Sequence, residues 1–158
     1  MAVQAEVQWL DEEQQRAWRN YLRGNQSLLE HLNRDLEESA GLSLSEYEVL
    51  VRLSEAEGRT LRMSVLAEDL VHSRSRLTHE VRRLEAGGYV ERRRCEEDGR
   101  GVTATLTDAG MARLAGAAPG HVASVRARLV DRLTAEQLRQ LGEIMSVLAD
   151  GEDIACPM

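Results

Sequence analysis

The sequence predicts a mainly α-helical fold that contains one small β-hairpin, and two observations carry this prediction. First, residues 64–86 hold two short segments with apolar side chains at helical spacing, separated by a tight polar connection, which is the pattern of a helix-turn-helix. Second, residues 89–106 alternate in polarity on both sides of a charged loop that contains glycine, as paired strands do. We therefore expect a helix-turn-helix followed by a hairpin at the centre of the fold.

The composition indicates one globular chain with an aliphatic core. Of its 158 residues, 42% are hydrophobic and 30% are charged, but only 3% are aromatic and none is Phe, so aliphatic side chains must fill the core. The sequence has no apolar run near the ~20 residues needed to span a bilayer and no basic-then-apolar N-terminal signal. We therefore expect a cytoplasmic protein without a membrane partner.

Catalytic and metal chemistry lack a sequence signal. Cys95 and Cys156 are too few and too isolated for a disulfide framework or a Cys-x-x-Cys site, and the four His residues form no ligand pattern. Neither a nucleophile elbow nor a phosphate loop is present. We expect no metal, no cofactor and no enzyme activity.

The N-terminal segment is expected to form one long helix. Residues 7–39 carry apolar side chains at roughly helical spacing, interrupted only by Gly24. The first large apolar side chains are those of Trp9, Leu10 and Trp18. They suit either a surface for a partner or packing within the same chain, and the sequence leaves both alternatives open.

A second helix is bounded by local signals. Gly41 ends the long helix, and Ser43 with Glu46 forms the capping-box pattern that starts the next one. We expect Gly58 to stop this second helix.

The helix-turn-helix follows a short extended piece at residues 61–63. Ser64 is the expected N-cap of a helix that runs through Leu70, and Ser73 is the expected N-cap of the helix after it. That second helix has a narrow apolar stripe at positions i, i+4 and i+7, formed by Leu77, Val81 and Leu84. Gly87 and Gly88 are expected to end it with a left-handed C-cap.

The hairpin and two further helices complete the chain. We expect strands over residues 89–95 and 102–106, with Val102, Ala104 and Leu106 facing inward. Thr107 then caps a helix that should run through Leu114 and that Pro119-Gly120 should kink or interrupt. A helical pattern resumes over residues 122–133, and the capping box that begins at Thr134 opens a last helix.

The second helix of the helix-turn-helix suits a DNA major groove. Away from its apolar stripe it carries hydrogen-bonding side chains, namely those of Arg74, Ser75, Arg76, Thr78, His79 and Arg82. Either Arg74 or Arg76 could bind guanine with both ends of its guanidinium, and Arg76→Ala should then change sequence preference. Ser64 and Ser73, at helix N-termini, could contact phosphates.

The hairpin supplies the second basic element. Arg92 and Arg94 share one side of the first strand, and Arg93 lies on the other. Arg100 stands between two glycines at the loop tip, where it could enter a minor groove. Asp98 is better placed to pair with a nearby arginine and orient it.

The net charge of −7 weighs little against a DNA partner. Affinity for DNA depends on where cations lie, and the acidic residues concentrate elsewhere, notably at residues 11–13 and 35–38. All 20 basic residues are Arg, which a GC-rich genome would also produce. The alternative function is a winged helix that binds another protein; the overall acidity favours it slightly, and Arg100 opposes it.

A family resemblance extends this interpretation. The order of helices, the segment SRSRLTHEVRRLEAGGYVERR and the segment DGRGVTATLTDAG resemble the MarR family of bacterial transcriptional regulators, over about residues 9–148. The resemblance implies a winged helix-turn-helix at residues 41–110. It also implies a homodimer built from an N-terminal helix (1–40) and C-terminal helices (111–150), with 151–158 as a flexible tail.

The resemblance also implies how such a protein acts. Residues 73–86 would be the recognition helix, and Asp98 and Arg100 match the wing motif. The family usually binds short pseudo-palindromic operators, mostly as repressors, and often loses affinity when a small, frequently phenolic, ligand binds between the DNA-binding and dimerisation regions. The candidate DNA-binding residues are Arg62, Ser64, Ser73, Arg74, Ser75, Arg76, Thr78, His79, Arg82, Arg93, Arg94, Asp98 and Arg100.

Sensing has only weak candidates in the sequence. The side chains of Trp18, Tyr21, His31 and Tyr47 could line a ligand pocket, although packing in the core is the simpler interpretation. Asp69 with His72 could form a responsive pair, but a solvated helix end explains them as well. Cys95 follows three arginines, which favours a reactive thiol, whereas Glu96 and Glu97 oppose it.

Overall fold

The computed structural model describes residues 7–70, 73–94 and 101–149, and it confirms a mainly helical fold with a small antiparallel sheet. The helices are α1 (Glu12–Ala40), α2 (Leu44–Glu55), α3 (Met63–Asp69), α4 (Arg74–Ala86), α5 (Asp108–Arg128) and α6 (Ala135–Leu148). The strands are β1 (Thr60–Arg62), β2 (Val90–Arg94) and β3 (Val102–Leu106), and single 3-10 turns occupy Glu57–Arg59 and Val130–Arg132.

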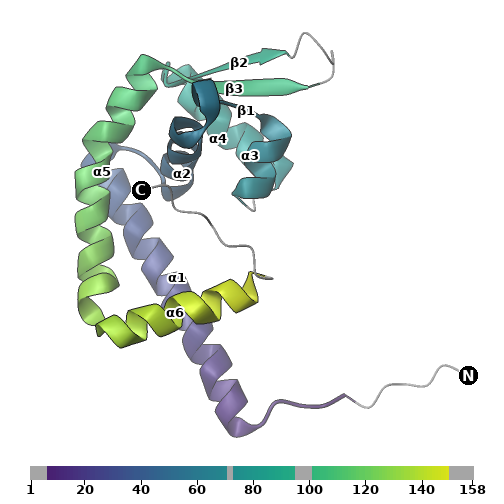
Figure 1. The fold of residues 1–158 in the computed structure, drawn as a ribbon, viewed down its shortest axis with the longest axis vertical. Coiled ribbons are helices and arrows are strands. Elements are labelled where there is room, and N and C mark those ends of the chain that lie inside the picture. Colours follow the sequence, from purple (N-terminus) through teal and green to yellow (C-terminus); the bar gives the residue numbers. More distant parts are fainter. Residues whose placement is uncertain (1–6, 71–72, 95–100, 150–158) are drawn as a thin grey trace, which may run out of the picture.

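The elements separate into two regions (Figure 1). The helices α2, α3 and α4 gather beside the three strands, and we call this region the winged domain. The long helices α1 and α5 run side by side away from it, and α6 turns back across α1 at the far end. Within the described ranges, no helix is long and apolar enough to cross a membrane.

The hydrophobic core lies in the winged domain. Its fully enclosed side chains include those of Leu50 and Leu53 from α2, Leu66 from α3, and Val81 from α4, each 0% exposed. Helices α1 and α5 add a few residues at their domain-proximal ends, among them Leu36 and Leu114. By contrast, α6 buries no residue at all.

The hairpin belongs to a sheet with one more strand than expected. Strands β2 and β3 pair in antiparallel fashion, and β1 pairs with the other edge of β3. The hydroxyls of Thr60 and Thr105 lie 2.8 Å apart across that second pair. Ala104 and Leu106 are buried as expected, while Val102 is half-buried.

Helix starts follow the local capping chemistry, with one exception. Side chains of Ser43, Ser73, Thr107 and Thr134 each accept a backbone hydrogen bond at the N-terminus of a helix, which confirms these four caps. The expectation for Ser64 was wrong: α3 starts at Met63, and Arg62 occupies the N-cap position without a side-chain bond. The end of β1 therefore leads directly into α3, with no residue between them.

Several helix boundaries also differ from expectation. Helix α1 begins at Glu12, where the side chain of Asp11 caps it, rather than at residue 7. Helix α2 stops at Glu55, before Gly58. Gly88, with φ of +75°, provides the left-handed residue after α4, while Gly87 stays right-handed.

Pro119 does not interrupt its helix. The helix α5 runs without a break from Asp108 to Arg128 and contains Pro119, although a proline in a helix interior removes one backbone hydrogen bond. The expected interruption at Pro119-Gly120 is therefore wrong, and α5 is one continuous, gently curved helix that joins the winged domain to the far end of the molecule (Figure 1).

Candidate nucleic-acid interface

Helix α4 is held to the winged domain by one side and leaves its other side open. Leu77, Val81 and Leu84 are at most 1% exposed and face the core. The Ser73 hydroxyl accepts a hydrogen bond from the Arg76 backbone N–H at 3.2 Å and so fixes the start of the helix. Five of the predicted DNA-binding side chains on α4 are exposed to solvent without a place in the core: Arg74, Ser75, Arg76, His79 and Arg82.

A basic hollow of about 350 Å³ adjoins the N-terminal end of α4. It lies where α4 meets the start of α3 and the start of β3, and it is lined by Arg62, Met63, Ser64, Arg74, Leu77, Thr78, Gly101 and Val102. Four predicted residues, from separate stretches of the sequence, therefore come together in one place. Met63 and Val102 gave no functional signal in the sequence, because apolar residues at element ends usually serve packing.

Thr78 contributes to this hollow mainly as an acceptor. Its hydroxyl donates to the Arg74 carbonyl oxygen one turn earlier in the same helix, at 2.7 Å. Because that hydrogen is committed to the helix, the oxygen lone pairs are what the side chain can offer to a ligand.

Arg76 is bound within the protein, which separates it from the other candidates. Its Nε donates to Glu80 Oε1 at 2.9 Å, and its guanidinium also donates to the hydroxyl of Ser45 on α2. Of the two arginines considered for guanine, Arg74 therefore lines the hollow, and Arg76 faces α2. Sequence reasoning missed this contact because Ser45 is 31 positions away.

The arginines of the first hairpin strand differ in their surroundings. Arg92 is half-buried and binds Glu85 of α4 through Nε at 3.0 Å, and this hydrogen bond holds the pKa of Glu85 below its usual value. Arg93 pairs with Glu91 at 3.1 Å while its side chain stays 77% exposed, and Arg94 is exposed as well. The structure thus leaves Arg93 and Arg94 accessible, while Asp98 and Arg100 of the wing lie outside the described residues.

The four candidate ligand residues do not form one pocket. Trp18 and Tyr21 stack on each other on α1, with ring centroids 5.9 Å apart, and both are exposed. Tyr47 is buried against His121 at 4.5 Å, and burial raises the pKa of its hydroxyl. His31 and Tyr21 line adjoining hollows beside Arg128. For Tyr47, the interpretation as a core residue is the one that the structure supports.

The other residues considered for sensing were Asp69, His72 and Cys95, and the structure describes only Asp69. Asp69 forms an ion pair with Arg52 of α2, so this carboxylate joins α3 to α2. His72 and Cys95 lie outside the described residues.

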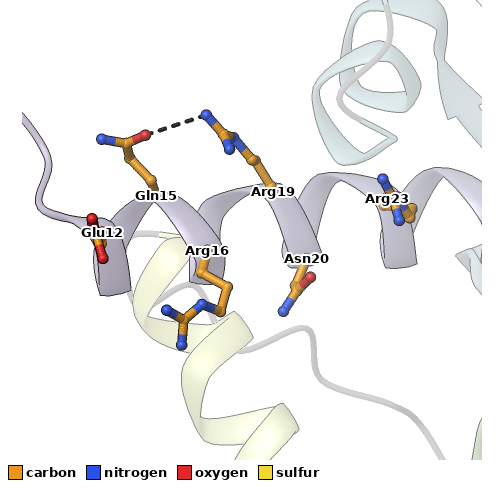
Figure 2. Close-up of a pocket in the computed structure, with 6 residues that line it drawn as sticks. All are labelled: Glu12, Gln15, Arg16, Arg19, Asn20 and Arg23. Carbon is orange, nitrogen blue, oxygen red and sulfur yellow. Dashed lines mark hydrogen bonds between the residues drawn. The ribbon is translucent and has the colours of Figure 1, made fainter.

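A second group of arginines lies on the N-terminal part of α1 (Figure 2), which extends away from α4 (Figure 1). A shallow hollow there is lined by Glu12, Gln15, Arg16, Arg19, Asn20 and Arg23. Figure 2 shows the side chains of Arg16 and Arg19 pointing away from each other, and Arg19 donates to Gln15 Oε1 at 3.2 Å. These side chains do not converge on one point, so the group lacks the geometry of an anion site.

The three helices α2, α3 and α4 beside a three-stranded sheet identify the chain as a winged helix-turn-helix protein. Comparison with known proteins then narrows the class. The model of the MarR family matches residues 40–101. No curated protein sequence matches the chain.

Solved structures resemble the chain over nearly its whole length. Sco3205, a MarR family transcriptional regulator from Streptomyces coelicolor that was solved in complex with DNA, is 45% identical, with coverage of 95% of this chain and 94% of that one and a TM-score of 0.88. AbsC, a MarR family transcriptional regulator from the same organism, is 42% identical over 91% and 97% of the two chains, with a TM-score of 0.84. Sco5413 from that organism is 26% identical over 90% and 99%, with a TM-score of 0.78. The chain belongs to the MarR family of transcriptional regulators.

Proposed function

We propose that this protein is a sequence-specific repressor that acts in the cytoplasm as a homodimer on a pseudo-palindromic DNA operator. In this proposal α4 enters the major groove and reads base edges, while the wing places Arg100 in the neighbouring minor groove. Residues 41–110 then form the DNA-binding unit, and residues 1–40 and 111–150 form the dimer interface.

One observation carries the DNA-binding part of the proposal. The exposed, polar side of α4 leads directly into the basic hollow that Arg62 and Arg74 line. Major-groove readers place the N-terminal end of a recognition helix at the bases, and arginine binds both guanine edges and phosphates. The complex of Sco3205 with DNA supports the same use of a similar fold.

The dimer is supported by apolar surface on α1 and α6. The exposed fractions of Trp18 on α1 and of Ile144 and Leu148 on α6 are 52%, 57% and 60%. A groove of about 640 Å³ between the two helices is lined largely by apolar side chains, including Tyr21, Leu141 and Met145. Because a large contiguous apolar surface marks an interaction site, a second copy of the chain is the proposed cover.

The part of the groove beside Tyr21 and Arg128 supports release by a small ligand, and the exposed side chains of Val147 and Leu148 outside the groove are left for the second copy. An aromatic or phenolic molecule could stack near Tyr21 and bind the Nη1 of Arg128, whose Nε and Nη2 donate to Asp35; both residues line the groove. Titration with salicylate should then quench tryptophan fluorescence and weaken DNA binding together. Quenching without a loss of DNA affinity would remove this part of the proposal and leave DNA binding intact.

Selection of bound sequences from a random duplex pool tests the main proposal. We expect an enriched pseudo-palindrome with half-site centres about one helical turn apart, roughly 34 Å. The affinity for the selected duplex should fall steeply with salt, because phosphate contacts release counterions. No enrichment and a flat salt response would instead favour a winged helix that binds another protein.

A further inference from the structure

Two arginines of α4 bind the start of α2. The guanidinium of Arg76 donates to Glu80 on its own helix and to Ser45 on α2. The Nε of Arg83 lies 2.9 Å from Glu46 Oε1, also on α2. Arg76, Glu80 and Arg83 are four and three residues apart, so they share one side of α4. This polar cluster ties α4 to the first turn of α2.

The carboxylates of this cluster are buried, whereas the arginines reach into solvent. The side chains of Glu46 and Glu80 are 5% and 9% exposed, against 62% and 59% for Arg83 and Arg76. Removing a cationic partner from a buried carboxylate is destabilising. Each carboxylate therefore favours retention of its arginine.

Glu46 has a second task in the same place. Its Oε2 accepts from the Ser43 backbone N–H at 2.9 Å, while the Ser43 hydroxyl accepts from the Glu46 N–H at 3.1 Å. One carboxylate thus fixes both the start of α2 and the side chain of Arg83. A rotation of α4 about its own axis moves both arginines relative to α2 and so strains these contacts.

We propose that Arg76 is a positioning residue of the DNA-binding surface and does not read bases. Together with Arg83, it fixes the angle of α4 on α2 through Ser45 and Glu46. Sequence preference then comes from other exposed side chains of α4, above all from Arg74, which lines the basic hollow, and from His79. This inference rests on the proposed DNA-binding function, and it reverses the expectation that Arg76→Ala changes sequence preference.

The opposing account gives Arg76 a direct contact with DNA. In that case the guanidinium leaves Glu80 and Ser45 when DNA binds, and it reaches either a base edge or a phosphate. The two accounts differ in three measurable quantities: the preferred sequence, the dependence of affinity on salt, and the effect of Ser45, which lies on α2.

The test compares wild type with Arg76→Ala and Ser45→Ala, at a temperature where each variant is fully folded by circular dichroism. We expect both variants to lose affinity by roughly two- to fivefold, the size expected for an ion pair open to solvent on one side. The loss should be the same for every duplex in the selected pool. The slope of log affinity against log salt should stay at its wild-type value, because no phosphate contact is removed.

Arg74→Ala is the matched control, since it removes an exposed arginine of the same helix turn that lines the basic hollow. It should change the preferred sequence, or lower the salt slope by about one if Arg74 binds a phosphate. Glu46→Gln keeps an oxygen for the cap but removes the charge that holds Arg83. It should reproduce the uniform loss seen for Ser45→Ala.

Three results would overturn the inference while leaving DNA binding established. The first is a changed base preference for Arg76→Ala, and the second is a lower salt slope. The third is an earlier melting temperature with unchanged affinity of the folded variant, which would make the cluster purely structural. A wild-type chain that selects no DNA would overturn the proposed function itself, and this inference with it.

Discussion

The winged domain and the far ends of α1 and α6 contain similar side chains in opposite surroundings. Leu50 and Leu53 of α2 are completely enclosed, whereas Val147 of α6 is 76% exposed and Trp9, just before α1, is 85% exposed. Among the described residues, the winged domain buries most of its large apolar side chains within the same chain. The far ends of α1 and α6 leave many of theirs exposed to solvent.

This contrast separates two ways in which apolar residues stabilise a protein. In the winged domain they contribute to the folding of a single chain, at about 25 cal/mol per Å² of buried apolar area. On α6 the exposed apolar side chains contribute only when another surface covers them. The same composition therefore predicts intrinsic stability in one region and dependence on concentration in the other.

The largest expected effect comes from a cavity in the winged domain. Leu53→Ala removes a fully enclosed side chain and should lower the free energy of unfolding by about 2–5 kcal/mol. Chemical denaturation at fixed protein concentration measures this loss. Val147→Ala is the control from the other region, and a similar loss for both would erase the contrast.

The next largest effect should come from placing a charge on α6, which would weaken the proposed dimer. Ile144 is 57% exposed, so Ile144→Glu should leave the folded chain intact but raise the dimer dissociation constant by about 100-fold or more, or ~2.7 kcal/mol. Sedimentation velocity across a concentration series measures it, with Ile144→Val as the conservative control. An unchanged mass distribution would place the dimer interface elsewhere.

Two glycines of α5 compare a packed position with an open one on a single helix. A Cβ on Gly110 would lie 2.1 Å from the Tyr89 carbonyl oxygen, whereas one on Gly116 would meet nothing within 4 Å. Gly110→Ala should therefore destabilise by about 1–3 kcal/mol through overpacking. Gly116→Ala should stabilise the chain by about 0.5–1 kcal/mol, because glycine is a poor helix former. Thermal melts of the two variants should move in opposite directions, and a shift of the same sign would contradict the packing described for α5.

The smallest effect concerns the polar link between α1 and α5. Hydrogen bonds from Arg128, with Nε 2.7 Å from Asp35, and from Ser124 lower the Asp35 pKa from 3.8 to about 2. Because the folded-state pKa is the lower one, this link stabilises the protein above pH 3.8 and is lost as the pH falls toward 2. Asp35→Asn should melt earlier than wild type at neutral pH, and the difference should shrink as the pH falls from 3.8 toward 2. A difference that is constant with pH would exclude this ion pair as its source.

Local signals predicted most of the helix starts because capping is decided within four residues. The side chains of Ser43, Ser73, Thr107 and Thr134 bond to backbone groups three positions away, so their chemistry can be recognised in the sequence. Ser64 shows the limit of this reasoning, because serine also occurs inside a first helical turn. Nothing local distinguishes the two positions.

Long-range pairing was beyond sequence reasoning for a physical reason. The strand β1 is only three residues long and depends on β3, with Thr60 opposite Thr105. The contact of Arg76 with Ser45 likewise joins two helices whose relative placement is decided by the core between them. Patterns of polarity report which side of an element is buried. They do not report which distant side chain lies opposite.

Because α5 is continuous, a small tilt at one end of this helix displaces its other end. At 1.5 Å per residue, its 21 residues give an arm of about 30 Å, so a tilt of about 5° at one end moves the other by ~3 Å. In the proposed dimer, the separation of the two recognition helices is then governed by an angle set far from the DNA. A shift of ~3 Å in each subunit is close to the rise of one base pair, about 3.4 Å, which makes operator spacing sensitive to small rotations at the helical end.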